Sequence, residues 1–290
     1  MYAKDFSYYA PESVDQALML LQSHGDAKLL AGGQSLIPLL KLRLAEVGTL
    51  VDLGRIAELR GISDEGDGLR FGAGTPYNQV IDSTSVRQRS PLIAQALSQV
   101  GDPQVRSRGT IGGSLAHADP AGDLPAVAMA LDAEITVASP RGKRTIPASD
   151  FFVDLLTTAL QPIEVITAAR FKTTDQPHTG TAYVKHRHPA SGYAVVGVAA
   201  VVTLGDDGTC QSARIGITGA GTHAARATSV EQALAGKPLD AATLEAACAT
   251  AADGLELMSD TYASDEYRAH LTRVLTSRAV QQAAEAAKSR

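Results

Sequence analysis

The stretch TIGGSLAHADPAGDLPAVAMAL, residues 110–131, places a glycine pair, two hydroxyls, a histidine, two aspartates and two prolines before an apolar run. This composition suits a loop that wraps around a ligand better than it suits a segment of the core. Gly112 and Gly113 lack a Cβ, so their backbone can adopt positive φ and their amides can approach a ligand closely. Thr110 and Ser114 add hydroxyl donors. Together these residue types favour an anion as the ligand.

A second stretch, AGGQSLIPLLKLRLA at residues 31–45, repeats this arrangement. Gly32 and Gly33 follow a short apolar run, which predicts that they lie at the end of a strand. Ser35 can cap a helix that accepts Pro38 in its first turn. The order is therefore strand, glycine pair and helix.

The two stretches together predict a clamp for a phosphate-bearing ligand. In the later stretch, Asp123 can cap a helix that has Pro125 in its first turn. Each glycine pair thus precedes a helix, where amide donors and the positive end of the helix favour the same negative charge. Two such corners that face each other would hold a diphosphate from both sides.

The composition argues against several classes of protein. A net charge of −5, without a basic stripe carrying aromatic residues, disfavours nucleic-acid binding. Cys210 and Cys248 are too few for a disulfide framework or for an iron–sulfur cluster, which needs about four ligands, and we expect both to be buried thiols. No apolar run reaches the roughly 18 residues of a membrane span, and the N-terminus lacks the order of an export signal. We therefore expect a cytoplasmic protein.

Length and hydrophobic periodicity predict an α+β fold of three units, residues 1–60, 61–175 and 178–290. A Gly- and Asp-rich turn separates the first two units, and the polar segment KTTDQPHTG separates the last two. In the first two units the expected strands are residues 6–10, 28–31, 50–53, 69–74, 134–139 and 143–146. The expected helices there are residues 14–21, 36–44, 77–82, 91–100 and 123–131.

The third unit is expected to hold three strands followed by three helices. The strands are residues 180–185, 194–204 and 210–218, and the helices are residues 230–235, 241–254 and 265–287. The last helix is rich in Ala, Gln and Arg. We expect it to be a solvated cover.

Two other kinds of nucleotide-binding motif are disfavoured by the sequence. Neither glycine stretch contains the Lys followed by Ser or Thr that a P-loop uses for phosphate and magnesium, which argues against an NTPase. Gly219, Gly221 and Ala224 form a GxGxxA after an expected strand, as in a nicotinamide-binding unit. The segment after it is expected to be helical and to lack a further strand of a βαβ unit, so this interpretation is disfavoured.

Catalytic and metal sites are weakly indicated. Ser114, His117 and Asp119 are the residue types of a hydrolytic triad, but they lie within six positions and no GxSxG elbow is present, so a local hydrogen-bonding role is favoured. His186 and His188 could share a metal, but no third ligand stands nearby. We therefore expect surface histidines there, no metal site and no catalytic residue.

The quoted motifs carry a family resemblance. AGGQSL at residues 31–36 and TIGGSLAHADPAGDLP at residues 110–125 resemble the paired FAD-binding motifs of the flavoprotein (medium) subunit of the molybdenum hydroxylases, the carbon monoxide dehydrogenase and xanthine dehydrogenase group. The resemblance implies a two-part FAD-binding domain of the PCMH/vanillyl-alcohol-oxidase-like type. A small C-terminal domain of a three-stranded antiparallel sheet and a helix bundle would follow.

The resemblance also implies roles for single residues. The residues on one side of the FAD diphosphate would be Ala31, Gly32, Gly33, Gln34, Ser35 and Leu36. Those on the other side would be Thr110, Gly112, Gly113 and Ser114. Asp123 would bond the ribityl or ribose hydroxyls, with Ala118 and Asp119 lining the same channel. Lys185 would lie near the pyrimidine edge of the flavin, and Tyr193 would cover one face of the ring.

Under this resemblance, substrate is oxidised elsewhere. A molybdenum–pterin centre and [2Fe-2S] clusters would belong to a large and a small partner subunit, in a dimer of heterotrimers, and FAD here would pass electrons to an external acceptor. A self-contained flavin oxidase or reductase and a non-redox scaffold that binds a nucleotide diphosphate remain as alternatives. The sequence leaves open whether the substrate is carbon monoxide, an aldehyde or an N-heterocycle. It also leaves the acceptor open among quinone, NAD and oxygen.

Overall fold

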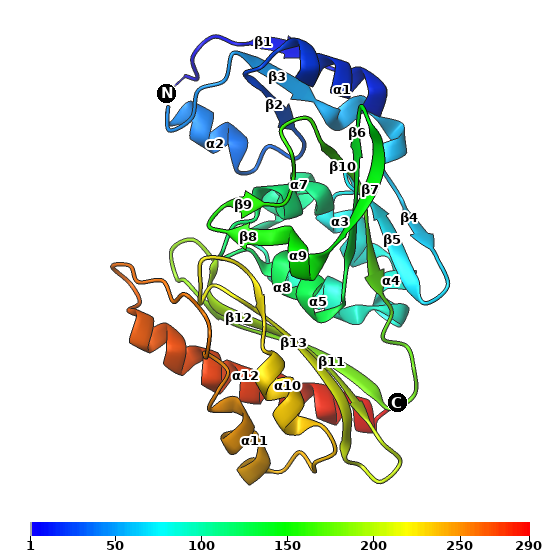
Figure 1. Cartoon of the computed structure of the whole chain (residues 1–290), viewed down its shortest axis with the longest axis vertical. Coiled ribbons are helices and arrows are strands. Elements are labelled where there is room, and N and C mark those ends of the chain that lie inside the picture. The colour runs from blue at the N-terminus through cyan, green and yellow to red at the C-terminus, as the bar shows by residue number, and fades with distance from the viewer. Residues whose placement is uncertain (1) are drawn as a thin grey trace.

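The structure is a computed structural model that describes residues 2–290. Its three larger sheets follow one another from one end of the molecule to the other (Figure 1), and β8 (Phe152–Asp154) and β9 (Thr157–Thr158) form a fourth sheet of two strands. The N-terminal sheet is parallel, with strand order β1-β3-β2. Its elements are β1 (Ser7–Tyr9), α1 (Val14–Ser23), β2 (Ala27–Leu30), α2 (Leu36–Lys41) and β3 (Thr49–Asp52), followed by the 3-10 turns η1 (Leu53–Arg55) and η2 (Ala57–Leu59). The predicted helix at residues 14–21 is confirmed as α1, and the Ser13 hydroxyl caps it by accepting the Gln16 amide at 3.2 Å.

The middle sheet is antiparallel, with strand order β4-β5-β10-β6-β7. Its strands are β4 (Ile62–Asp64), β5 (Gly68–Gly72), β6 (Glu134–Ser139), β7 (Gly142–Pro147) and β10 (Val165–Lys172). Between β5 and β6 the chain forms α3 (Tyr77–Asp82), α4 (Thr84–Arg89), α5 (Pro91–Ser98), α6 (Pro103–Arg108), α7 (Ile111–His117) and α8 (Asp123–Ala130). Short α9 (Ala148–Phe151), β8 (Phe152–Asp154) and β9 (Thr157–Thr158) precede β10. The 134–139 and 143–146 hairpin is confirmed, whereas α4, α6 and α7 were not predicted.

The C-terminal sheet is antiparallel, with strand order β11-β12-β13-β14. Its strands are β11 (Thr179–Arg187), β12 (Ala194–Leu204), β13 (Cys210–Thr218) and β14 (Ala225–Arg226), and its helices are α10 (Thr228–Leu234), α11 (Ala241–Cys248) and α12 (Asp265–Lys288). The three predicted strands and helices are present. The edge strand β14 was missed because two residues carry no periodicity, and α11 ends six residues before the prediction.

The prediction that the last helix, α12, is a solvated cover was wrong. The helix packs along β11 and β12 (Figure 1), and it buries Leu271, Leu275, Val280 and Ala283. Gly180 of β11 lies so close that a Cβ there would overlap the Ala283 carbonyl oxygen. Leucines and alanines at helical spacing form a narrow apolar stripe, which the charged residues on the other face obscure in the composition.

The opposite face of the C-terminal sheet packs on α8, whose residues are buried on all sides. Asp123 begins this helix but does not cap it, because Gly122 occupies the N-cap position. The Asp123 carboxylate instead accepts the Tyr183 hydroxyl at 2.5 Å and lies 2.8 Å from the Lys185 ammonium. Both charged side chains are at least nine-tenths buried. A buried ion pair therefore joins the C-terminal sheet to the helix layer of the middle sheet.

The Asp123–Lys185 ion pair predicts that substitutions of its two members have coupled effects on the free energy of unfolding. Lys185→Met should lower the free energy of unfolding by about 3–5 kcal/mol, because it leaves the buried Asp123 carboxylate without its cation. The double variant Asp123→Asn/Lys185→Met should be more stable than Lys185→Met alone, because no buried charge remains unpaired. Denaturant unfolding of the wild type, both single variants and the double variant measures this. Strictly additive losses would contradict the coupling.

A second cluster predicts acid sensitivity. The carboxylate oxygens of Asp132 form ion pairs with nitrogens of three cationic side chains, Lys172 at 3.1 Å, Arg214 at 3.2 Å and Arg226 at 2.6 Å. Burial raises the pKa of the Asp132 carboxyl, but the bonds to these cations outweigh burial and lower it overall. A depressed pKa stabilises the fold above the unfolded pKa, about 3.9, and this contribution is lost as the pH falls through the folded pKa.

Asp132→Asn should therefore destabilise the protein at pH 7 and lose its effect in acid. Asn tolerates the left-handed backbone at this position, where φ is 45°. Thermal unfolding of both proteins from pH 7 down to about pH 2 tests the sign, since this range crosses the unfolded pKa. A gap between the two melting temperatures that does not narrow below about pH 4 would refute the assignment.

Candidate functional site

A cavity of about 730 Å³ opens between the two glycine stretches. Its walls come from the loop after β2, from α7 and its preceding residues, and from the loop before β12. This volume lies within the range of roughly 300–1,000 Å³ that is usual for small-molecule and cofactor sites. All three parts of the chain therefore contribute to one site.

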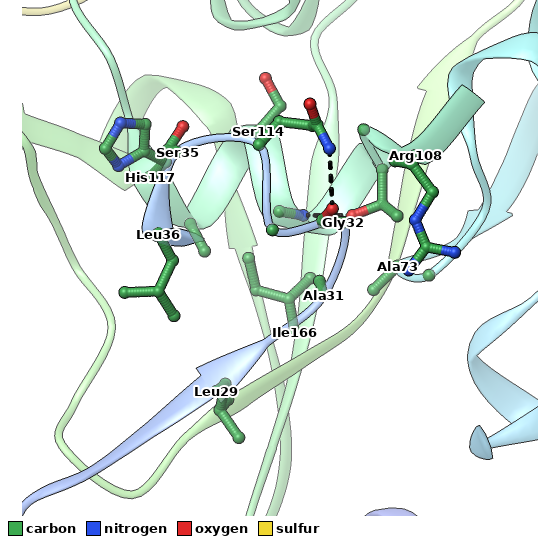
Figure 2. A pocket seen from close by; sticks show the side chains of 18 of the residues that line it. Leu29, Ala31, Gly32, Ser35, Leu36, Ala73, Arg108, Ser114, His117 and Ile166 are labelled. Carbon is green, nitrogen blue, oxygen red and sulfur yellow. Dashed lines mark hydrogen bonds between the residues drawn. The ribbon is translucent and has the colours of Figure 1, made fainter. Parts of the chain in front are cut away.

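The two glycine stretches touch at the cavity. A Cβ on Gly32 would overlap the carbonyl oxygen of Arg108, so backbone lies directly on backbone. A Cβ on Gly113 would lie 3.6 Å from the Ala31 Cβ. Figure 2 shows the loop of Gly32 crossing beside Arg108, with Ser114 of α7 nearby. The prediction that the two stretches meet around a shared cleft is confirmed.

The loop of residues 32–35 carries unused backbone donors. Gly33 has a φ of +75°, as predicted for a glycine corner. Within residues 2–290, none of the four amides of this loop donates a hydrogen bond, and all four residues line the cavity. Successive unused amides of this kind form a concave anion-binding surface.

The predicted cap by Ser35 was wrong. Ser35 occupies the N-cap position of α2, but its side chain accepts no capping hydrogen bond. Its φ of −102° and ψ of −49° are helical, whereas a capping residue is extended. The Ser35 hydroxyl therefore remains available to the cavity that the residue lines.

The later glycine pair differs from the prediction. Gly112 and Gly113 lie inside α7 and do not have positive φ. Their amides are already bonded, Gly112 to the Ala73 carbonyl at 2.7 Å and Gly113 to the Thr110 hydroxyl at 3.1 Å. A Cβ on Gly112 would lie 2.5 Å from the Ala73 Cβ, so close packing on the middle sheet explains this glycine. The amides of this pair are therefore already used, and within residues 2–290 the unused amides lie on the other stretch.

The cavity also holds polar side chains from the ADPAG segment. The distance from Asp119 Oδ2 to His117 Nε2 is 3.8 Å, and Asp119 Oδ1 accepts the Ala121 amide at 2.9 Å. No hydrogen bond joins Ser114 to His117 within the described residues, so the three do not form a hydrolytic triad. Tyr193 is 45% exposed, and burial together with the charge of Asp119 raises the pKa of its phenol.

Most of the residues singled out from the sequence line this cavity. They are Ala31, Gly32, Gly33, Gln34, Ser35, Leu36, Thr110, Gly112, Gly113, Ser114, Asp119, Asp123 and Tyr193. Ala118 does not line it, because this residue is 2% exposed and belongs to the hydrophobic core beside α7. Lys185 does not line it either, because its side chain points to Asp123 and to the Gln99 carbonyl.

Other lining residues were missed. Arg108 lines the cavity directly before the second stretch, and within residues 2–290 its guanidinium forms no ion pair. Its place before TIGGS was the signal available in the sequence. Leu160, Pro162 and Ile166 complete a wall from around the start of β10, and no sequence pattern indicated them.

Three weaker sequence motifs lie outside this cavity. Gly219 of the GxGxxA has a φ of +81° and donates to the Pro120 carbonyl at 2.7 Å, and the strand β14 follows it. Within residues 2–290, no group of three His, Cys, Asp or Glu residues is placed to hold a metal, which includes His186 and His188. Cys210 and Cys248 are free and buried, as expected. No helix in the same range is both long and apolar enough to cross a membrane.

Two family models match the chain in order. The FAD binding domain in molybdopterin dehydrogenase matches residues 4–171, and the CO dehydrogenase flavoprotein C-terminal domain matches residues 181–283. The carbon monoxide dehydrogenase medium chain of Hydrogenophaga pseudoflava is 39% identical over 95% of this chain and 96% of its own. The alpha subunit of the 6-hydroxypseudooxynicotine dehydrogenase complex of Paenarthrobacter nicotinovorans is 37% identical over 96% of this chain and 94% of its own.

Solved structures agree with these matches. A chain of carbon monoxide dehydrogenase from Hydrogenophaga pseudoflava superposes with a TM-score of 0.94 at 39% identity, covering 98% of both chains. A chain of quinoline 2-oxidoreductase from Pseudomonas putida 86 superposes with a TM-score of 0.93 at 33% identity, covering 99% of both. The chain therefore belongs to the FAD-binding medium subunits of the molybdenum hydroxylases, the carbon monoxide and xanthine dehydrogenase family, and is an oxidoreductase subunit.

Proposed function

We propose that this chain binds FAD in the cavity between its two glycine stretches and passes electrons from partner subunits to an external acceptor. The observation that carries the proposal is the loop of residues 32–35: all four residues line the cavity, and none of their backbone amides donates a hydrogen bond within residues 2–290. A diphosphate satisfies such a set of donors. When bound, FAD supplies the redox chemistry, and the protein supplies binding, orientation and electrostatics.

The cavity has a polarity that orients such a cofactor. At one end the loop of residues 32–35, whose amides donate no hydrogen bond within residues 2–290, lies against the backbone of Arg108. The Arg108 side chain forms no ion pair in the same range, and its positive charge on the cavity wall also favours the diphosphate there. At the floor Asp123 lines the cavity with Lys185 behind it, so the negative end of this pair faces inward. An anionic diphosphate is disfavoured at that floor, whereas hydroxyls and a flat ring are not. Tyr193 stands where it can cover the ring.

Lys185 has a different role in this proposal from the one that the family resemblance implied. Its side chain is fully buried on Asp123, so it acts on the cavity through that carboxylate and does not touch the ring. Asp123 in turn is available only at the edge of the cavity, since Tyr183 and Lys185 already bind it. The pair fixes the floor of the site.

The electron donors and the substrate site are proposed to lie on other chains. Relatives of this chain are named the medium chain of carbon monoxide dehydrogenase, a subunit of a 6-hydroxypseudooxynicotine dehydrogenase complex and the FAD-binding subunit of xanthine dehydrogenase. By analogy, a small subunit with [2Fe-2S] clusters and a large molybdenum subunit complete a dimer of heterotrimers. Because those relatives are named for unlike substrates, selection of the substrate belongs to the large subunit.

Substitution in the glycine loop tests the FAD site. Gly32→Ala should weaken FAD binding by at least about tenfold, roughly 1.4 kcal/mol, because its Cβ displaces the loop from Arg108. Gly25→Ala is the matched control, since a Cβ there meets nothing within 4 Å and the backbone φ is not positive. Titration with FAD, followed by fluorescence, compares both variants with the wild type. Unchanged affinity in a folded Gly32→Ala protein would refute this placement of the diphosphate.

Purification of the chain alone and with its partners tests the assignment of function. The chain should retain or take up FAD and show flavin absorbance near ~450 nm, since that absorbance belongs to the cofactor. Alone it should oxidise no carbon monoxide, aldehyde or N-heterocycle, and it should be reduced by these only in the complex. Turnover of a small donor by the isolated chain would favour a self-contained oxidase or reductase. Failure to bind FAD would favour a scaffold.

A further inference from the structure

We infer that His188 is a positioning residue for the cofactor site: it fixes the loop of residues 188–193, which forms the third wall of the cavity. The inference rests on the proposed FAD site. Ser191, Gly192 and Tyr193 line the cavity, whereas His188 does not, so it acts through the loop and not by contact with a ligand. We call residues 188–193 the Tyr193 loop.

His188 bonds to the Tyr193 loop through its backbone and through its ring. Its amide donates to the Tyr193 carbonyl at 2.8 Å, and its carbonyl accepts the Gly192 amide at 2.9 Å. Its ring nitrogen Nδ1 accepts the amides of Ala190 at 3.2 Å and Ser191 at 3.4 Å. The loop is therefore closed around one side chain.

This geometry fixes the protonation of the ring. A nitrogen that accepts two backbone amides carries no proton, so the neutral ring holds its proton on Nε2. Protonation of Nδ1 would replace the acceptor by a donor that faces two other donors. The loop is thus closed by the neutral histidine only.

The His188 ring is also held by a later segment of the C-terminal domain. Tyr262 packs on it, with ring centroids 4.5 Å apart and planes at 59°. Asp260 accepts the amides of Tyr262 and Ala263, both at 2.8 Å, and its carboxylate binds the buried Arg268 at 2.5 Å. The position of His188 is therefore fixed by a chain of contacts that begins on α12.

The Tyr193 loop also reaches the FAD-binding part of the chain. Gly192 has a φ of +74°, and a Cβ there would lie 3.9 Å from the Cα of Gly101, which also lines the cavity. The carboxylates that act on the loop from that side are Asp119 and Asp123, through the phenol of Tyr193. Arg187, the last residue of β11, donates to the Gln99 carbonyl. Tyr262 and Asp260 lie on the side of the Tyr193 loop that faces α12.

Two substitutions test separately the two roles of the His188 side chain, as an acceptor for the loop amides and as a ring that packs on Tyr262. His188→Asn keeps an oxygen that can accept the amide two residues on, as in an Asx turn, but it cannot titrate. His188→Phe keeps a ring to pack on Tyr262 but has no acceptor. Both variants are made in the whole 290-residue chain, and their affinity for FAD is measured from pH 8 to pH 5.

The wild type should bind FAD several-fold more weakly at pH 5 than at pH 8, because a protonated Nδ1 cannot accept the amides of Ala190 and Ser191. His188→Asn should bind like the wild type at pH 8 and stay constant to pH 5. His188→Phe should be weak throughout, by about tenfold, since two backbone amides lose their acceptor. Hydrogen exchange of the Tyr193 loop at pH 8, without FAD, should be faster in His188→Phe than in the wild type and His188→Asn.

Two results would overturn the inference: His188→Phe that binds FAD as tightly as the wild type at pH 8, or His188→Asn with the same pH dependence as the wild type. Slow hydrogen exchange of the loop in His188→Phe would contradict it independently of any ligand. If the wild type binds no FAD at any pH, the proposed function fails, and the exchange measurement still decides whether His188 closes the loop.

Discussion

The site depends on one contact, the backbone of Gly32 against the carbonyl of Arg108. No side chain takes part, so the distance between the two stretches is set by the two backbones alone. The Arg108 side is rigid because the amides of Ile111 and Gly112 bond to Thr75 and Ala73 of the middle layer. The N-terminal sheet therefore meets a fixed wall, and the unused amides of residues 32–35 are left at its edge.

The C-terminal domain completes the same site from the opposite side. The Thr218 hydroxyl lies 2.7 and 2.8 Å from the carbonyls of Pro120 and Gly122, and the Gly219 amide donates to Pro120 as well. These bonds fix the turn between α7 and α8, which carries Asp119 into the cavity. Docking of the C-terminal domain and the shape of the cavity therefore depend on the same contacts.

The sequence predicted the elements with clear periodicity and the meeting of the two glycine stretches. It failed where tertiary packing outweighs local preference. Glycine costs about 1 kcal/mol inside a helix, so Gly112 and Gly113 indicated a loop, yet close packing on Ala73 makes a helix the better solution. Asp123 looked like a cap because its partners, Tyr183 and Lys185, lie some sixty residues away in the chain. A partner at that separation leaves no local pattern.

The residues that shape this cavity are hard to find from composition. A diphosphate site made of backbone amides uses no characteristic side chain, and only the glycines that permit the close approach mark it. Asp123 and Lys185 carry opposite charges, so the pair has no net charge but forms a dipole. The direction of this dipole is set by which of the two residues lines the cavity, and that residue is Asp123. Burial strengthens that dipole, because little water screens it. The arrangement of these two common residues in space, and not their presence in the sequence, therefore decides that the carboxylate and not the ammonium lines the cavity.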